Sequence, residues 1–363
     1  MSQSKSFQPD WTSSPTKTIL DILEKRKISL QDFSKELFGE STDALEKLNS
    51  DIKINTKIAT KLKSILGPST EFWLEREAQY RSSLNYLIKL KDEKETISWI
   101  KSLPIKDMIK RGWIKTRSTT EEMLKECLNF FEVENISSWH NKYNEEIQTS
   151  LFRTSLKYES NPGAVAAWIR RGEILSDSIQ CKTWNPQKFK ETLFELRSLT
   201  FKRDPNLFLQ ELRQKCSECG VAFVLLKAPE GCRASGVTKF LSKNKALIIL
   251  SFRFLSNDHF WFSFFHEAGH LILHNKNSIF LEGISNTSNK EEDEANNFAA
   301  EILVPQRYKV ELLSLKANKQ SILNFSKTVG VHPGIIVGQM QHYNIIRRNQ
   351  MNGFKRRYQW VTE

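Results

Sequence analysis

The feature that most constrains the fold of this chain is a pair of histidines four residues apart inside an apolar run. The run is WFSFFHEAGHLILH, from Trp261 to His274, and it contains His266, Glu267 and His270. Imidazole and carboxylate groups are costly to bury unless a hydrogen bond, an opposite charge or a metal compensates them. On a helix, residues i and i+4 share one face, with Cβ atoms about 5–6 Å apart. The run therefore predicts a buried helix whose two histidines face a common partner.

This spacing predicts that the common partner is a zinc ion. Two imidazoles one helical turn apart can both reach one Zn²⁺ at about 2.0–2.1 Å. Glu267 directly follows the first histidine, so it would lie beside the metal, where it could accept a proton from a bound water. The alternative is two core histidines with unrelated hydrogen bonds, which the helical context and the rarity of the motif disfavour. We therefore predict His266 and His270 as zinc ligands and Glu267 as the catalytic base.

An acidic helix further along the chain supplies candidates for a third ligand, because a catalytic zinc usually has three protein ligands and one open position. The segment NKEEDEANNFAAEILVP predicts a helix with one apolar face, and Glu291 and Glu292 lie at opposite edges of that face. Either carboxylate could point inward, and Glu292 has Asn296 four residues on, where the amide could orient the carboxylate. The alternative is a solvated acidic helix start, which the helix dipole favours. Glu291, Asp293 and Glu294 fit that alternative.

Periodicity divides the 363 residues into four regions and predicts a multidomain fold. Residues 1–95 contain a polar tail (1–16) and then short helical patterns, which predict an all-α helix-turn-helix domain. Residues 96–180 keep helical patterns without catalytic groups, and we interpret them as a helical connector. Residues 181–345 predict an α+β domain with a small sheet, because β-branched runs alternate there with amphipathic helices. Residues 346–363 are a basic C-terminal tail. The β-branched runs are residues 221–226, 235–242 and 246–252.

Composition narrows the classes of function. No apolar run approaches the ~20 residues that span a bilayer, and residues 1–17 lack the apolar core of a secretion signal. We therefore expect a cytoplasmic protein without membrane contact, whose five cysteines are free thiols. Lys and Arg outnumber Asp and Glu by 54 to 42, which gives a net charge of +12. That charge favours an acidic partner such as nucleic acid, and it also fits a solvated basic surface.

Two motifs in this order and spacing resemble the ImmA/IrrE family of zinc metallopeptidases: HFWFSFFHEAGHLILH and then EEDEANNFAAEILVP. The resemblance extends through VAAWIRRGEI, CRASGVTKFLS and VGVHPGIIVGQMQH, so it covers about residues 165–345. It implies a gluzincin-like metallopeptidase domain that binds Zn²⁺. A helix Glu four residues before an Asn resembles the third-ligand pattern of gluzincins, which gives the ligand role to Glu292. Members of the family are associated with cleaving repressors, antitoxins or transcription factors, often under stress or in phage-related responses.

The first 80 residues resemble the HigA-like antitoxin form of the XRE-type helix-turn-helix domain, best in KINTKIATKLKSILGPSTEFWLEREAQY. The expected recognition helix, STDALEKLN, departs from that pattern. It contains Asp43 and Glu46, which would repel phosphates, and Lys47 is its one base. Ser41, Thr42 and Lys47 are the residues that could reach DNA. If the domain does not bind DNA, we expect it to bind a protein or to form a homodimer.

Two further features have open interpretations. His274 lies eight residues after His266, on roughly the same side of the helix. It could contact a metal ligand or the substrate, or it could be a hydrogen-bonded core histidine. The basic cluster within residues 346–363 could contact nucleic acid or form a solvated tail.

Two functions from different classes follow. The first is a zinc-dependent endopeptidase that cleaves a specific regulatory protein, such as a repressor, antitoxin or toxin partner, in a toxin–antitoxin, stress or phage-defence setting. The second is a DNA-binding transcriptional regulator or antitoxin of HigA type, in which the zinc domain is a sensor or is weakly active. The presence of Glu267 favours the first, because a domain without catalysis would not need the base.

Overall fold

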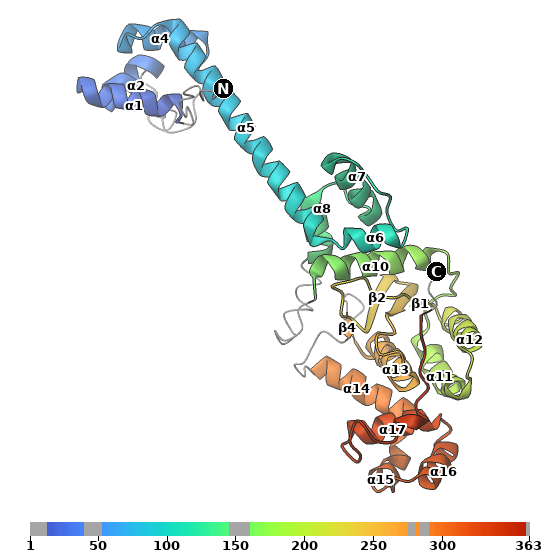
Figure 1. Cartoon of the computed structure of the whole chain (residues 1–363). Coiled ribbons are helices and arrows are strands. Elements are labelled where there is room, and N and C mark those ends of the chain that lie inside the picture. The colour runs from blue at the N-terminus through green and yellow to red at the C-terminus, as the bar shows by residue number, and fades with distance from the viewer. Residues whose placement is uncertain (1–12, 40–52, 145–159, 275–279, 283–289, 361–363) are drawn as a thin grey trace, which may run out of the picture. The chain divides into compact units, whose positions relative to one another are not determined.

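The chain divides into two compact units, Met1–Ile97 and Ser98–Glu363 (Figure 1). None of the described helices combines the length and the apolar character that crossing a membrane requires. The computed structural model of the protein describes residues 13–39, 53–144, 160–274, 280–282 and 290–360.

The described part of the first unit consists of helices around one small apolar core. That core includes Phe33, Leu62 and Trp73, which are fully buried. Asn55 caps the start of α4 with its side chain, and Gly67, with φ of +85°, ends the same helix. The helices are α1 (Pro15–Arg26), α2 (Leu30–Phe38), α4 (Thr56–Leu66) and the first part of α5 (Thr70–Ser102), which continues into the second unit.

The expected recognition helix of the first unit lies outside the described residues. Ser41, Thr42 and Lys47, which could reach DNA, all fall in the stretch 40–52. The helices expected on either side of that stretch are present. The helix-turn-helix arrangement itself therefore stays a prediction.

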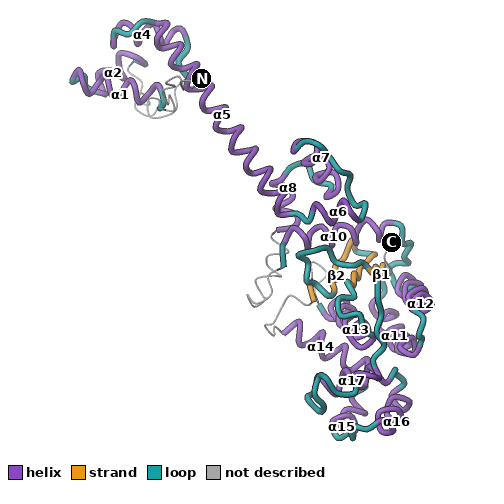
Figure 2. The backbone as a smooth tube through the Cα atoms, viewed as in Figure 1, coloured by secondary structure: helices purple, strands orange, loops and turns teal. Residues whose placement is uncertain are grey.

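The second unit is built on a small four-stranded sheet surrounded by helices (Figure 2). The strand order is β1-β3-β2-β4. β3 pairs in parallel with β1 and antiparallel with β2, and β4 pairs antiparallel with β2. The three predicted β-branched runs correspond to β1, β2 and β3. β4 was not predicted, because three residues are too few to show an alternating pattern. The strands are β1 (Val221–Leu225), β2 (Gly236–Ser242), β3 (Lys245–Leu250) and β4 (Phe280–Glu282).

One face of this sheet packs into the larger core of the unit. Successive side chains of a strand point to opposite faces, so Ala246, Ile248 and Leu250 of β3 enter this core. The long helix α13 crosses this face and contacts both β2 and β3. The helices that contribute to this core are α11 (Pro186–Leu196), α12 (Pro205–Ser217), α13 (Asn257–Leu273), α14 (Lys290–Leu303), α15 (Lys309–Leu313), α16 (Lys319–Val329) and α17 (Pro333–His342).

The other face of the sheet packs against the helices that the sequence suggested as a connector. Leu247 and Ile249 share a core there with Trp99, Phe131 and Trp168. The compact unit therefore begins at Ser98 and includes both the expected connector and the expected α+β domain. The helices on this face are α6 (Ile105–Lys110), α7 (Thr120–Phe131), α8 (Ile136–Trp139) and α10 (Pro162–Asp177).

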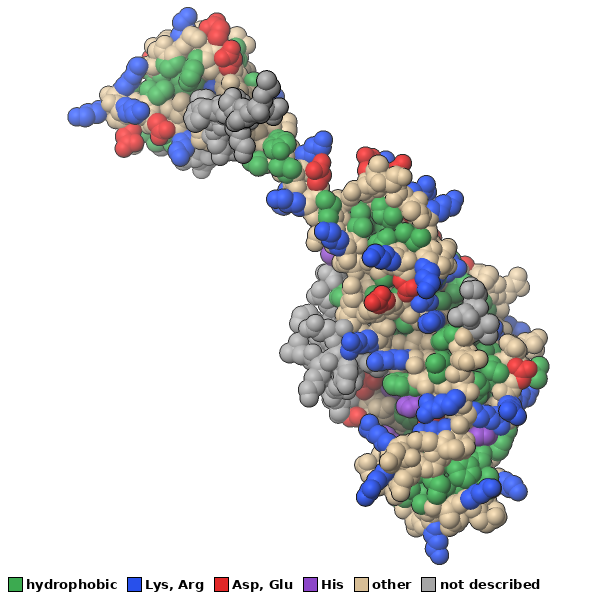
Figure 3. Space-filling model, in the orientation of Figure 1, with side chains coloured by type: hydrophobic (Ala, Val, Ile, Leu, Met, Phe, Trp, Pro, Cys, Tyr) green, Lys and Arg blue, Asp and Glu red, His purple; other side chains and the backbone are tan. Residues whose placement is uncertain are grey.

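The basic C-terminal segment is not a solvated tail, which corrects one of the two interpretations above. Lys355 forms a buried ion pair with Asp258 in the first turn of α13. The backbone N–H of Asn257 donates to the carbonyl of Arg356 at 3.0 Å, and that of Tyr358 donates to a carbonyl just before α13. The segment therefore fastens the start of α13. The remaining Lys and Arg side chains are spread over the visible face of the unit rather than gathered in one patch (Figure 3).

Candidate metal centre

α13 carries the H-E-x-x-H residues into the middle of the second unit. The helix packs against β2, β3, α14 and α17. Its aromatic residues Phe264 and Phe265 are fully buried in the larger core. Because neighbours cover the helix on several sides, an apolar sequence without a polar stripe is what this position requires. His266, Glu267 and His270 are at most 1% exposed.

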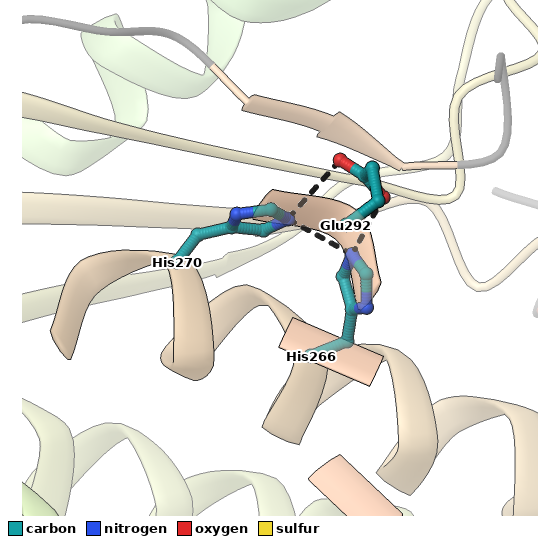
Figure 4. A group of neighbouring side chains, drawn as sticks. All are labelled: His266, His270 and Glu292. Atoms are coloured by element: carbon teal, nitrogen blue, oxygen red, sulfur yellow. Dashed lines mark hydrogen bonds and ion pairs between the residues drawn. The ribbon is translucent and has the colours of Figure 1, made fainter. Parts of the chain in front are cut away.

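Three side chains from two helices converge on one point: His266 and His270 from α13, and Glu292 from the first turn of α14 (Figure 4). One ligand atom from each lies within 4.8 Å of the other two. The Nε2 atoms of the two histidines are 3.0 Å apart, and each is 3.4 Å from a carboxylate oxygen of Glu292. The structure thus brings together the three residues that the sequence and the resemblance named.

Outer hydrogen bonds show which ring nitrogens of His266 and His270 carry protons. The Nδ1 of His266 lies 3.0 Å from Asn296 Oδ1, an acceptor, so this Nδ1 donates. His274 Nε2 lies 3.1 Å from Glu294 Oε2, and His274 Nδ1 lies 2.9 Å from His270 Nδ1. Since the carboxylate only accepts, His274 donates to it through Nε2, and in that tautomer its Nδ1 accepts from the Nδ1–H of His270. Both ligand histidines therefore direct an Nε2 lone pair at the centre.

The charge states of the same groups agree with a cation site. Burial penalises the charged carboxylate of Glu292, but the two histidines outweigh burial and lower its pKa to about 2. Burial lowers the pKa of His270 to about 4, although Glu292 acts in the opposite direction. At neutral pH the centre therefore combines an ionised Glu292 carboxylate with the neutral imidazole of His270. Two lone pairs and a negative charge that face one another repel, and a positive ion between them would be attracted to all three.

The spacing of the three ligand atoms fits zinc. Ligands bound tetrahedrally at about 2.0–2.1 Å are separated from one another by roughly 3.3–3.4 Å. The two Nε2 atoms are 3.0 Å apart, and each lies 3.4 Å from a different oxygen of Glu292, so each of these distances is close to that value. Two histidines, one carboxylate and an open fourth position form a set typical of catalytic zinc. A zinc ion would therefore be held by His266, His270 and Glu292.

Glu267 lies beside this centre, in contact with β2. Its carboxylate accepts a hydrogen bond from the hydroxyl of Thr238. At Gly236 a Cβ would lie 2.8 Å from the Cδ of Glu267, so only glycine leaves room for this carboxylate. Neither β2 residue was predicted from the sequence, because nothing in the local pattern links β2 to a helix about thirty positions later.

Asn296 was expected to orient Glu292 from outside the centre, and the structure shows it in contact with another of the three residues, the ring of His266. One expectation about the acidic helix requires correction. Glu294 was expected to be a solvated residue, but it accepts from His274 and so supports His270 indirectly. His274 itself contacts a metal-ligand residue, which was one of the interpretations left open. Outer partners of this kind orient a ligand histidine and raise its basicity.

Comparison with known proteins supports a peptidase class for this part of the chain. Residues 234–336 match the model of the peptidase M78 family, described as the IrrE N-terminal-like domain. The matched stretch runs from just before β2 into α17, so it contains Glu267 and all three convergent residues. No curated protein matches the chain. The match covers well under half of the sequence. It supports a metallopeptidase-type domain from a family that uses a metal, typically zinc.

Proposed function

We propose that this chain is a zinc-dependent endopeptidase that cleaves a specific regulatory protein. The observation that carries the proposal is the pairing of a three-ligand centre with a buried carboxylate beside it. His266, His270 and Glu292 direct two lone pairs and a negative charge at one point. Glu267 is held next to them by Thr238 and is available for proton transfer.

Each residue of the centre then has a distinct role. When bound, zinc polarises a peptide carbonyl and lowers the pKa of a bound water to about 7. Glu267 accepts a proton from that water and passes it to the leaving amine. The Thr238 hydroxyl donates to one carboxylate oxygen of Glu267 and so fixes the orientation of the carboxylate. Asn296 and the pair His274–Glu294 fix the orientation of the two histidine rings.

The substrate class and the role of the first unit follow from the resemblance to the ImmA/IrrE and HigA-like families. We propose a repressor, an antitoxin or a toxin partner as the substrate, in a toxin–antitoxin, stress or phage-defence setting. The first unit would target or regulate cleavage through binding of DNA or protein. The second candidate function is a HigA-type regulator with a weakly active zinc domain. The presence of a separate helical unit with its own core supports this alternative.

The substitution Glu267→Gln tests the proposal. Gln is nearly isosteric and is not a ligand, so zinc content and melting temperature should match the wild type. The amide cannot accept the proton, and loss of a general base lowers rates by about 10²–10⁴-fold. Glu301→Gln, on the exposed side of α14, is the matched control and should cleave normally.

The substrate can be sought in cells by mass spectrometry. Proteins that disappear with the wild type, but not with Glu267→Gln, are candidate substrates. If the Glu267→Gln variant represses or protects as well as the wild type does, catalysis is dispensable and the regulator function replaces the endopeptidase.

A further inference from the structure

A pocket of about 240 Å³ lies between α13, α14 and α17, beside the metal centre. Phe262 lines the pocket and lies one helical turn before His266 on α13. The ring centroids of Phe262 and His266 are 6.3 Å apart, so the same ring borders the pocket and neighbours a metal ligand. A substrate side chain that flanks the cleaved bond would therefore lie within reach of this pocket.

The accessible lining of the pocket is mainly aromatic. His259 and His342 are exposed and Phe262 is half-buried, whereas the two aliphatic lining residues are at most 2% exposed and belong to the larger core. The ring centroids of Phe262 and His342 are 6.4 Å apart. Next to them, the exposed Phe254 stacks on His259 at 4.4 Å. Aromatic rings from α13 and α17 are therefore the surface that a ligand would meet.

The buried polar groups behind these rings do not select the ligand. Asp258 and Gln339 also line the pocket, but their acceptor atoms Oδ1 and Oε1 have essentially no exposed surface. The other carboxylate oxygen of Asp258 pairs with the buried Lys355. Hydrogen bonds to these residues therefore give no preference, and contacts with the exposed rings decide what the pocket binds.

Charged side chains are disfavoured in this pocket. Burial lowers the pKa of His259; three basic residues act in the same direction and Asp258 acts in the opposite one. The basic residues are Lys355, Arg357 and Arg348. Their charges disfavour a Lys or Arg side chain nearby. No Lys or Arg is among the described residues that line the pocket, so a carboxylate would exchange water for aromatic rings without gaining a partner.

The size of the pocket fits an aromatic ring. A cavity of ~150 Å³ lined by Leu, Ile and Phe is large enough to bind benzene, and this pocket is larger. Gly338 of α17 lines it where α17 approaches α13, since a Cβ there would lie 3.0 Å from the Cβ of Asp258. Contacts between aromatic rings are more favourable than the burial of their area alone.

We propose that this pocket binds the aromatic side chain of a phenylalanine or tyrosine next to the peptide bond that is cut. The rings of Phe262, His259 and His342 would contact the bound ring. The inference rests on the proposed peptidase function, to which it adds a substrate preference.

Binding to an inactive variant tests the pocket separately from catalysis. Zinc-loaded full-length Glu267→Gln protein would be incubated with a degenerate peptide library, and the captured peptides would be sequenced. We expect Phe or Tyr to be enriched about tenfold over Ala, Lys and Glu at one position, because even one methylene in an apolar pocket changes selection by ~10–200-fold. Adding Phe262→Ala should abolish the enrichment. Adding Phe194→Ala, the same change at an exposed residue of α11, should preserve it.

His342→Ala gives a second variant in case Phe262→Ala unfolds or loses zinc, because His342 is exposed at the opposite wall of the pocket. It should reduce the enrichment several-fold while melting temperature and zinc content match the wild type. Capture without an aromatic preference, capture that both substitutions leave unchanged, or no capture at all would each overturn the pocket.

Cleavage of the same library by the wild type tests the peptidase independently. Mass spectrometry of the products should place Phe or Tyr beside the cut. Aromatic-selective capture without cleavage would keep the pocket and overturn the peptidase. Cleavage without an aromatic residue beside the cut would keep the peptidase and overturn the pocket.

Discussion

The candidate chemistry of the second unit lies in its core, whereas the chemistry predicted for the first unit lies on residues 40–52, outside the described structure. Both units bury apolar helix faces that helical periodicity predicts. In the second unit, His266, Glu267 and His270 are also buried, at most 1% exposed. An amphipathic pattern is satisfied by many packing partners, but a buried polar group needs particular partners. Buried polar positions therefore restrict the function of a chain far more than its apolar stripes do.

Removing the two histidines should cause the largest change, a loss of zinc, and would show that the second unit binds the metal. The double variant His266→Ala/His270→Ala should contain almost no zinc by elemental analysis, because two of three ligands are lost. Glu292→Ala should keep the two histidines and bind zinc more weakly than wild type. Glu267→Gln is the control that should retain the metal. If the double variant still binds zinc fully, the metal site lies elsewhere. The buried histidines would then no longer distinguish the second unit from the first.

A substitution on β2 should impair catalysis while leaving the metal in place. Gly236→Ala puts a Cβ against the carboxylate of Glu267, as the 2.8 Å approach to its Cδ shows. Misplacing a catalytic group by about 1 Å can cost ~10²-fold in rate. Peptide hydrolysis and zinc content would be measured together. Gly353→Ala, where a Cβ meets nothing within 4 Å, is the control. Normal activity of Gly236→Ala would show that the position of Glu267 is not critical.

The outer partners of the ligand histidines should have a smaller effect on zinc affinity. Glu294→Ala removes the acceptor of His274 and so loosens the ring of His270. Losses of such partners typically weaken metal binding by about 10–100-fold, and we expect the lower end because Glu294 acts through a second histidine. Competition with a chelator measures this. Glu301→Ala, exposed on the same helix, should match the wild type. If Glu294→Ala and Glu301→Ala bind zinc equally well, Glu294 does not support the site and is a solvated residue, as the sequence predicted.

The smallest effect concerns the first unit. If it binds DNA through Ser41, Thr42 and Lys47, affinity should fall as salt rises, since phosphate contacts release counterions. Lys47→Ala should reduce the slope of that dependence by about 1. Gel shifts of the full chain on its own promoter region at several salt concentrations would show this, with Lys319→Ala of the second unit as control. If micromolar protein gives no salt-sensitive gel shift, the first unit does not bind this DNA, and protein binding becomes its proposed role.

The sequence predicted the parts of the site that lie close together along the chain. The i,i+4 spacing of His266 and His270 required a helix, and α13 is that helix. The inward edge of α14 left Glu291 and Glu292 as candidates, and the structure places Glu292 at the centre. These predictions used only helical geometry, which is the same in every α-helix.

The missed parts depend on contacts between distant segments. Thr238 reaches Glu267 only because β2 lies under α13, and no local pattern encodes that crossing. Glu294 was assigned to solvent because a helical wheel allows one packed face. α14, however, also meets His274, where α13 ends. The roles of Thr238 and Glu294 depend on how distant segments pack, and the periodicity of the sequence does not predict that packing.

The fastening of α13 by the C-terminal segment has a consequence for synthesis of the protein. Lys355 and Arg356 hold the first residues of the helix that carries His266 and His270. A ribosome makes the two histidines long before it makes this fastening. A growing or prematurely terminated chain therefore contains the motif but lacks the residues that hold its helix in place.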